Sequence, residues 1–240
     1  SAQLSAVLGS AVIQANPFLT GKTASYVVDW AERKMGRKLP TPATTDAGQT
    51  TTTEVRQTSP EFEKYKQAIT ALVEGDSTLG EAVAMDDYKV NGMEVTIDEE
   101  ASRILATRGP TAGDLRVIVA IIKTITDLER IGDEGEKIGY IASRLASMER
   151  PADKYREVKH LGRLVSEMVH GALDSFARLD AQAALTVAQE DKVVDEEYES
   201  IQRQCITFMM EDPRTIRRAL DVMWVVRALE RIGDHAKNIC

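Results

Sequence analysis

The hexapeptide LERIGD occurs twice in this chain, at Leu128–Asp133 and again at Leu229–Asp234. Each copy lies in a proline-free stretch whose apolar residues recur every three or four positions, as they do on one face of an α-helix. These residues are Leu115, Ile118, Val119, Ile122, Ile125, Leu128 and Ile131 around the first copy, and Ile216, Leu220, Met223, Val226, Leu229 and Ile232 around the second. The two copies therefore predict two long amphipathic helices with the same local pattern.

A second pair of similar segments precedes the hexapeptides. The segment 87–91 reads DYKVN and the segment 191–195 reads DKVVD, so their first residues are 104 positions apart. The two LERIGD copies begin at residues 128 and 229, which are 101 positions apart. The nearly constant spacing indicates that a unit of three helices has been duplicated, with a small difference in one connection.

Prolines mark the expected starts of three helices, because the missing N–H of proline costs least in the first helical turn. Pro60, Pro110 and Pro213 stand at such positions, and no segment alternates clearly enough to be a strand. We expect six helices, at residues 60–75, 78–108, 111–149, 153–179, 181–210 and 213–240. The predicted fold class is all-α, with two tandem three-helix bundles.

The first 58 residues have a different composition. Residues 25–39 show one short amphipathic helical pattern, and residues 40–58 are rich in Thr and poor in large apolar side chains, as is typical of a linker. We therefore expect a divergent, poorly defined N-terminal segment at 1–58, a first bundle at 59–150 and a second bundle at 151–240.

The composition excludes several classes of protein. The net charge of −8 argues against non-specific nucleic-acid binding, which needs a basic surface. No apolar run reaches the roughly 20 residues of a membrane span, so membrane insertion is not expected. Cys205 and Cys240 form no disulfide framework, which indicates a reducing compartment, and we predict a cytoplasmic protein.

Acidic residues recur one helical turn apart, and this spacing places them on one face of a helix. The positions are Asp87 and Asn91, Glu129 and Asp133, Asp191 and Asp195, and Glu230 and Asp234. Like charges at this spacing are destabilising unless a cation lies between them, and oxygen ligands favour Mg²⁺, Ca²⁺, Mn²⁺ or high-valent iron. The pairs are candidate metal ligands.

Such a pair can equally be a solvated helix face, with charges neutralised by Arg130, Arg231, Lys123 or Lys137. Gly132 and Gly233 accompany two of the pairs, although glycine inside a helix costs about 1 kcal/mol relative to alanine. Close packing of a neighbouring helix explains these glycines better than a ligand does.

No catalytic set is recognisable. The three histidines, His160, His170 and His235, form no Glu-x-x-His pair, and no phosphate-binding loop or zinc-spaced cysteine pair occurs. His235, next to Asp234, is expected to be an ordinary surface or hydrogen-bonded histidine rather than a ligand. Met209, Met210 and Trp224 are expected in the core. No catalytic residue is named, and the chain is not expected to be an enzyme.

Four segments together carry a resemblance to a known family. KTITDLERIGDEGEKI at 123–138, DKVVDEEYESIQRQ at 191–204, TFMMEDPRTI at 207–216 and RALERIGDHAKNI at 227–239 are similar to the PhoU family, regulators of bacterial phosphate uptake. The resemblance covers about residues 71–240. It implies a cytoplasmic, often dimeric protein of two three-helix PhoU repeats. It also implies two protein partners, the ATPase subunit of the phosphate transporter and a phosphate-sensing histidine kinase.

The resemblance also implies multinuclear metal sites, in which iron, manganese, magnesium or zinc ions bind E(D)xxxD motifs. The motif falls on Glu129 and Asp133 and on Glu230 and Asp234, with Asp191 and Asp195 beside the latter. On the second helix it falls on Asp87, but Asn91 replaces the second acid with a weaker neutral ligand. Residues before about Glu63 do not resemble the family's first helix. The chain ends soon after the second motif, so we expect a frayed last helix and weakened dimerisation.

Three functions remain open from the sequence. The first is a negative regulator of phosphate uptake and phosphate-starvation signalling, which acts as a metal-binding adaptor. The second is a carboxylate-cluster metalloenzyme acting on phosphate compounds, and the third is a helical scaffold whose acids only face solvent. The absence of a positioned acid or base favours the adaptor over the enzyme.

Overall fold

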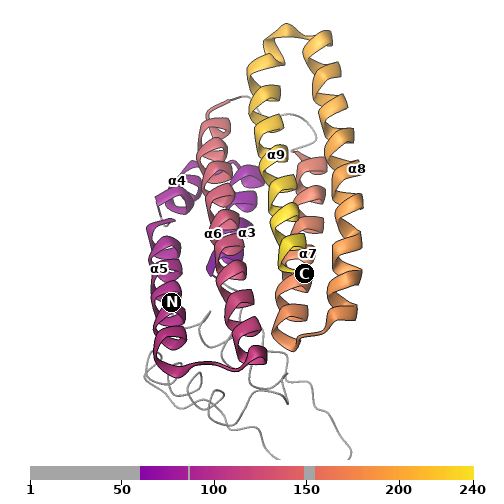
Figure 1. The fold of residues 1–240 in the computed structure, drawn as a ribbon. Helices are drawn as coiled ribbons and strands as arrows, with labels where there is room; N and C mark the ends of the chain where they lie inside the picture. Colours follow the sequence, from indigo (N-terminus) through magenta and orange to yellow (C-terminus); the bar gives the residue numbers. More distant parts are fainter. Residues whose placement is uncertain (1–59, 86, 149–154) are drawn as a thin grey trace, which may run out of the picture.

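The computed structural model describes residues 60–85, 87–148 and 155–240, and Figure 1 shows their arrangement. Every regular element in these ranges is helical, which confirms the all-α prediction. The elements are α3 (Pro60–Glu74), α4 (Ser77–Met85), α5 (Asp87–Arg108), α6 (Ala112–Ala146), α7 (Arg156–Arg178), α8 (Ala181–Glu211), the 3₁₀ turn η1 (Pro213–Thr215) and α9 (Ile216–Ile239). The expected N-terminal segment 1–58, with its amphipathic stretch at 25–39, lies outside the described residues.

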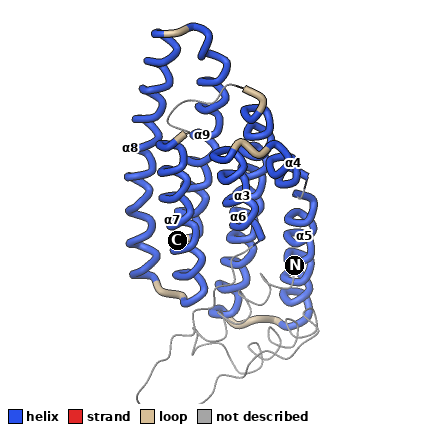
Figure 2. Tube along the Cα trace, turned by 180° about the vertical axis from the view of Figure 1, so that it is seen from behind, coloured by secondary structure: helices blue, strands red, loops and turns tan. Residues whose placement is uncertain are grey.

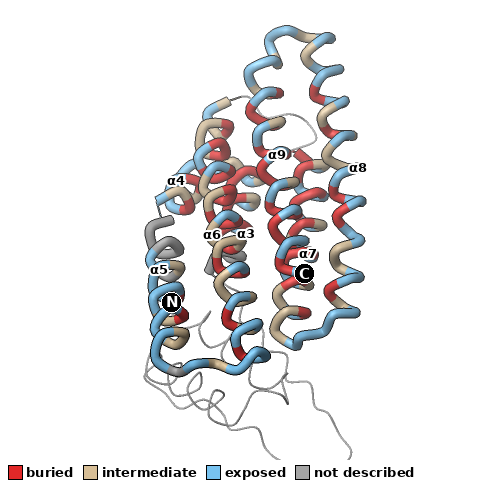
Figure 3. The backbone as a smooth tube through the Cα atoms, viewed as in Figure 1, coloured by how far each residue is buried: buried red, intermediate tan, exposed pale blue. Residues whose placement is uncertain are grey.

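The two predicted bundles are present, and they share one core. In the first, α3, α4 and α5 pack on α6, while in the second α7, α8 and α9 pack on one another (Figures 1 and 2). α6 also packs along α9, and α3 reaches α7. Figure 3 shows the buried positions concentrated on the central helices, with α5 and α8 exposed on the outside. The helices that carry LERIGD, α6 and α9, thus form the seam between the two halves.

The prediction of one continuous helix over 78–108 is wrong, because this range forms α4 and α5, which are set at an angle to each other (Figure 1). α4 is held against the far part of α6 by a contact between glycines: a Cβ on Gly80 would lie 2.7 Å from the carbonyl oxygen of Gly139. Ser143 of α6 also donates a hydrogen bond to Glu81 at 3.3 Å. These contacts fix α4 against α6.

Prolines lie at or within three residues of three helix starts, as predicted. α3 begins at Pro60, and α6 begins two residues after Pro110, where the Thr111 hydroxyl donates to Asp114 at 2.8 Å. Pro213 opens η1, from which α9 continues. The expected fraying of the last helix is not observed, since α9 is regular to Ile239, whose side chain is buried.

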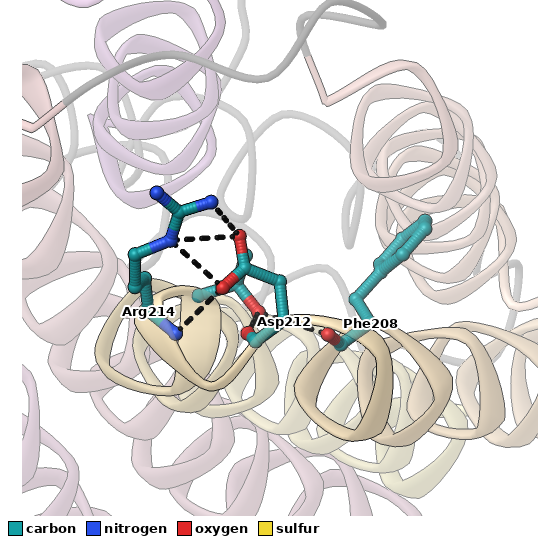
Figure 4. Close-up of polar contacts among 4 residues, drawn as sticks. Phe208, Asp212 and Arg214 are labelled. Atoms are coloured by element: carbon teal, nitrogen blue, oxygen red, sulfur yellow. Dashed lines mark hydrogen bonds and ion pairs between the residues drawn. The ribbon is translucent and has the colours of Figure 1, made fainter.

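The connection between α8 and α9 is a compact turn built around Asp212 (Figure 4). The Asp212 carboxylate accepts hydrogen bonds from the backbone N–H of Arg214 and from its Nε, both at 3.0 Å, while the Asp212 N–H donates to the carbonyl of Phe208. These bonds lower the pKa of the Asp212 carboxyl, with the Arg214 side chain as the largest cause. The turn sets the register in which α9 returns along α8.

Candidate functional site

The second LERIGD copy lies against the DKVVD segment of α8. A Cβ on Gly233 would lie 3.3 Å from Val194 Cγ1 and 4.0 Å from Asp191 Oδ1. The first of these distances is tighter than an ordinary van der Waals contact, so the glycine allows α9 to approach α8 closely beside Asp191. This confirms the packing explanation for Gly233. In the first copy, Gly132 is buried as well.

Four of the predicted metal ligands lie close together where α9 packs on α8, because their charges act on one another's carboxyl groups. Partial burial, followed by the negative charges of Asp191 and Asp234, raises the pKa of the Asp195 carboxyl. Burial is also the largest cause of the raised pKa of Glu230, to which Asp234, Asp195 and Asp191 add in that order. The two pairs predicted from different helices therefore form one acidic cluster, consisting of Asp191, Asp195, Glu230 and Asp234.

Basic side chains compensate part of this charge. Arg227 donates to Glu230 Oε1 at 2.9 Å, and Lys237 donates to Asp191 Oδ2, which raises the pKa of Lys237. The second oxygen of Glu230, Oε2, is buried and accepts no hydrogen bond within the described part of the chain. A buried acceptor without a partner is costly, so this oxygen has capacity for a further ligand.

The cluster is not a preassembled metal site. Among the described residues, no three His, Cys, Asp or Glu side chains are placed to hold one ion together. Asp191 is engaged by Lys237, and Glu230 shares one oxygen with Arg227. The oxygen-only donor set suits a hard cation, and binding one requires these side chains to rearrange.

The first predicted cluster is described only in part. Glu129 and Asp133 are partly buried, one turn apart on α6. Asp87 and Asn91 belong to α5, but their side chains lie outside what the structure describes. Whether they meet the α6 pair therefore stays a prediction.

Three polar pairs that sequence reasoning missed cross the seam between α6 and α9. His235 Nδ1 lies 2.9 Å from Asp127 Oδ1. Arg231 lies 3.1 Å from Glu134, which also accepts from Lys137, and Arg144 Nε donates to Asp221 at 3.0 Å. Arg231 and Lys137 were expected to neutralise the acid pairs, but both contact Glu134. The expectation for His235 is confirmed in that it is buried and hydrogen-bonded.

Comparison with known proteins agrees with the duplicated architecture. The PhoU domain matches residues 63–142 and again 158–240, one match in each half of the fold. The chain belongs to the PhoU family. Among curated PhoU relatives, the "Phosphate-specific transport system accessory protein PhoU homolog" of Pseudomonas putida is 52% identical over 176 residues, covering 73% of this chain and 69% of the relative. The PhoU protein of Escherichia coli (strain K12), which has the name "Phosphate-specific transport system accessory protein PhoU", is 46% identical over 179 residues, covering 74% and 73%.

Solved PhoU structures have the same fold. The crystal structure of PhoU from Pseudomonas aeruginosa superposes with a TM-score of 0.72 at 50% identity, covering 75% of this chain and 86% of that one. The phosphate transport system regulatory protein PhoU from Streptococcus pneumoniae gives a TM-score of 0.70 at 27% identity, covering 75% and 84%. In the described part of this PhoU-family chain, no helix has the length and apolar character needed to cross a membrane.

Proposed function

We propose that this chain is a negative regulator of phosphate uptake and of phosphate-starvation signalling. It acts in the cytoplasm as an adaptor between the ATPase subunit of a phosphate transporter and a phosphate-sensing histidine kinase, as a homodimer and without catalysing a reaction. The observation that carries this proposal is the pair of PhoU domain matches, joined to relatives whose names describe a phosphate-transport accessory protein rather than an enzyme.

The adaptor role is tested by binding and by complementation. The full chain is immobilised and exposed to the purified transporter ATPase subunit and to the cytoplasmic region of the kinase, each with an unrelated ATPase as control. In a strain without its own copy, the gene is expected to lower phosphate uptake and repress a phosphate-starvation reporter in phosphate-rich medium. Absence of binding to both proteins, together with unchanged uptake, would refute the adaptor role.

The second part of the proposal is that the acidic cluster of α8 and α9 binds metal ions of the Fe, Mn, Mg or Zn class. Asp191, Asp195, Glu230 and Asp234 would supply oxygen ligands. A cation there would offset the burial and, second to it, the mutual repulsion that raise the pKa of Asp195 and Glu230. Glu129 and Asp133, with Asp87 and Asn91, would form the corresponding site of the first repeat.

Elemental analysis by plasma mass spectrometry tests the metal assignment. Wild-type protein is compared with the double variant Glu230→Ala/Asp234→Ala, purified in the same way. The matched control is Arg163→Ala/Glu167→Ala, which removes an exposed ion pair from α7. The cluster variant is expected to lose metal that the control retains, whereas equal metal content in all three proteins would contradict the assignment.

A further inference from the structure

Large apolar side chains are exposed along the outer face of α9. Ile216, Leu220 and Trp224 follow one another at intervals of four residues, and they are 41%, 45% and 64% exposed. This spacing places them in one stripe on the helix surface. Trp224 was expected in the core, and that expectation is wrong, since the core side of α9 is filled by Val225, Val226, Leu229 and Ile232.

An exposed aromatic side chain of α6 is linked to the segment of α9 that carries this stripe. Arg144 of α6 lies over the ring of Tyr140, 5.8 Å from its centroid, and its Nε also donates to Asp221 of α9. Asp221 follows Leu220 directly and lies three residues before Trp224. Tyr140 itself is 65% exposed. We call Ile216, Leu220, Trp224, Tyr140 and the neighbouring Arg217 the α9 docking face.

Trp, Tyr and Arg are the residues that most often dominate binding energy at protein interfaces. Aromatic side chains bring a large contact area with few rotatable bonds, and an exposed group of them is costly unless something covers it. Within the described residues, α6, α7 and α8 are the helices that make the main contacts with α9, and Ile216, Leu220 and Trp224 remain exposed beside them.

The local charge indicates what covers the face. The chain as a whole carries −8, whereas residues 213–231 contain five arginines and two acids. Both acids are engaged, Asp221 by Arg144 and Glu230 by Arg227, and Arg214 and Arg231 are engaged as well, by Asp212 and Glu134. Arg217, which is exposed beside the stripe, therefore gives the face a positive charge on an acidic protein, and a partner that presents an acidic side chain beside an apolar centre complements it.

The same charge argues against a second copy of this chain as the occupant. A two-fold symmetric interface brings the same patch of both copies together, so Arg217 of each copy would meet a face whose charged residue is again an arginine. Like charges brought together at an interface are unfavourable.

We propose that the α9 docking face binds an amphipathic helix of another protein. The apolar side of that helix packs on Leu220 and Trp224, and its acidic flank meets Arg217. Apolar residues of such a helix recur every three or four positions and match the spacing of the stripe. That the helix belongs to the transporter ATPase or to the kinase rests on the proposed function, whereas the chemistry of the face does not.

Binding by biolayer interferometry tests the face in the full chain, with the ATPase subunit and the kinase region as analytes. Trp224→Glu and Arg217→Glu are each expected to raise the Kd at least about tenfold, since both remove interface-type contacts. Leu185→Glu, which changes an exposed leucine on α8, is the matched control and is expected to leave the Kd unchanged. All variants are checked by circular dichroism for native helix content.

A second experiment tests the docking face without the natural partner. Trp30 and Trp224 are the two tryptophans of the chain, so Trp30→Phe leaves Trp224 as the fluorescent probe. A synthetic helical peptide with leucine at every third or fourth position and glutamate between is expected to shift the Trp224 emission to the blue. The same peptide with lysine in place of glutamate is expected to leave the emission unchanged.

The two experiments test the α9 docking face separately from the proposed adaptor function. If a partner binds wild type, Trp224→Glu and Arg217→Glu with equal affinity, the face is wrong while the adaptor function stands. If neither protein binds wild type, the adaptor function is refuted, and the docking face is then tested by the Trp224 emission in the presence of the synthetic peptides. A blue shift with the glutamate peptide alone then supports the face, and no shift overturns it.

Discussion

Arg231 of α9 reaches across the seam between the two repeats and lies 3.1 Å from Glu134 of α6. The Glu134 side chain is 4% exposed, and Lys137 from its own helix also donates to it. A buried carboxylate between two helices is stabilised only while its cationic partners remain. The LERIGD sequence therefore contributes its arginine, as well as its apolar residues, to holding the two halves together.

Arg231→Ala is expected to destabilise the fold by roughly 1–3 kcal/mol, because it leaves the buried Glu134 with Lys137 alone. Arg203→Ala provides the comparison, since Arg203 pairs with Glu199 on α8 and both side chains are more than 60% exposed. That variant is expected to cost less than about 1 kcal/mol. Urea denaturation measures both free energies of unfolding, and equal values would show that the seam pair contributes no more than a surface pair.

Gly80→Ala is expected to loosen α4 from α6. The added Cβ would lie 2.7 Å from the carbonyl oxygen of Gly139 and 3.0 Å from the backbone nitrogen of Ser143, so backbone must move to accept it. Overpacking of this kind costs typically about 1–3 kcal/mol. Gly92→Ala is the control, because Gly92 lies inside α5, nothing lies within 4 Å of its added Cβ, and alanine favours a helix interior by about 1 kcal/mol. Thermal unfolding should move in opposite directions for the two variants, and a shared direction would argue against the close helix contact.

The acidic cluster makes the stability of the metal-free protein depend on pH. The pKa of Glu230 is raised above its ordinary 4.5 in the folded chain, chiefly by burial. At a pH between the ordinary pKa of the unfolded chain and the raised pKa of the folded chain, the folded state binds more protons than the unfolded state. The free energy of unfolding therefore falls as the pH rises through that range. Glu230→Gln removes this contribution, and Asp195→Asn removes the similar one of Asp195.

Urea denaturation in the presence of a chelator, from pH 7 down to pH 4.5, is expected to show this difference directly. The wild type gains more stability on acidification than Glu230→Gln does. An unchanged slope in the variant would mean that Glu230 does not titrate in that range.

Much of the fold followed from local sequence patterns. Helical periodicity and the prolines predicted α3, α6, α8 and α9 to within a few residues, and the duplication predicted the two bundles. The division of 78–108 into α4 and α5 was not predicted, and neither was the packing of α4 on α6 at Gly80 and Gly139, which are 59 residues apart in the chain. The shared core was also not predictable, since periodicity identifies an apolar face but not the helix that covers it.

The residues of the candidate site were likewise predicted only where the pattern is local to one helix. The spacing of Asp191 with Asp195 and of Glu230 with Asp234 identified acids that lie together, because each pair is local to one helix. Their basic partners were not identified, since the contact between Lys237 and Asp191 depends on the register of α9 against α8. Trp224 and Met210 were both wrongly expected in the core, since Met210 is 80% exposed. A helical repeat of apolar residues does not distinguish a buried face from an exposed one.

In the proposed metal site, Lys237 would compete with the cation for Asp191, because its ammonium group donates a hydrogen bond to one carboxylate oxygen. Lys237→Met removes this competitor and leaves the four carboxylates less compensated. The affinity for Mn²⁺ is therefore expected to rise on the order of tenfold, as the loss of one charge-assisted hydrogen bond would give. In the metal-free state the same variant is expected to melt at a lower temperature, since the repulsion within the cluster increases.

Isothermal titration calorimetry with MnCl₂ measures the affinity of the chelator-treated protein. Lys192→Met is the matched control, because Lys192 follows Asp191 on α8 but pairs with the exposed Glu196. It is expected to bind Mn²⁺ as the wild type does. If Lys237→Met binds Mn²⁺ no more tightly than Lys192→Met, Asp191 is not a ligand, and the metal site, if present, is built from the remaining acids of the cluster.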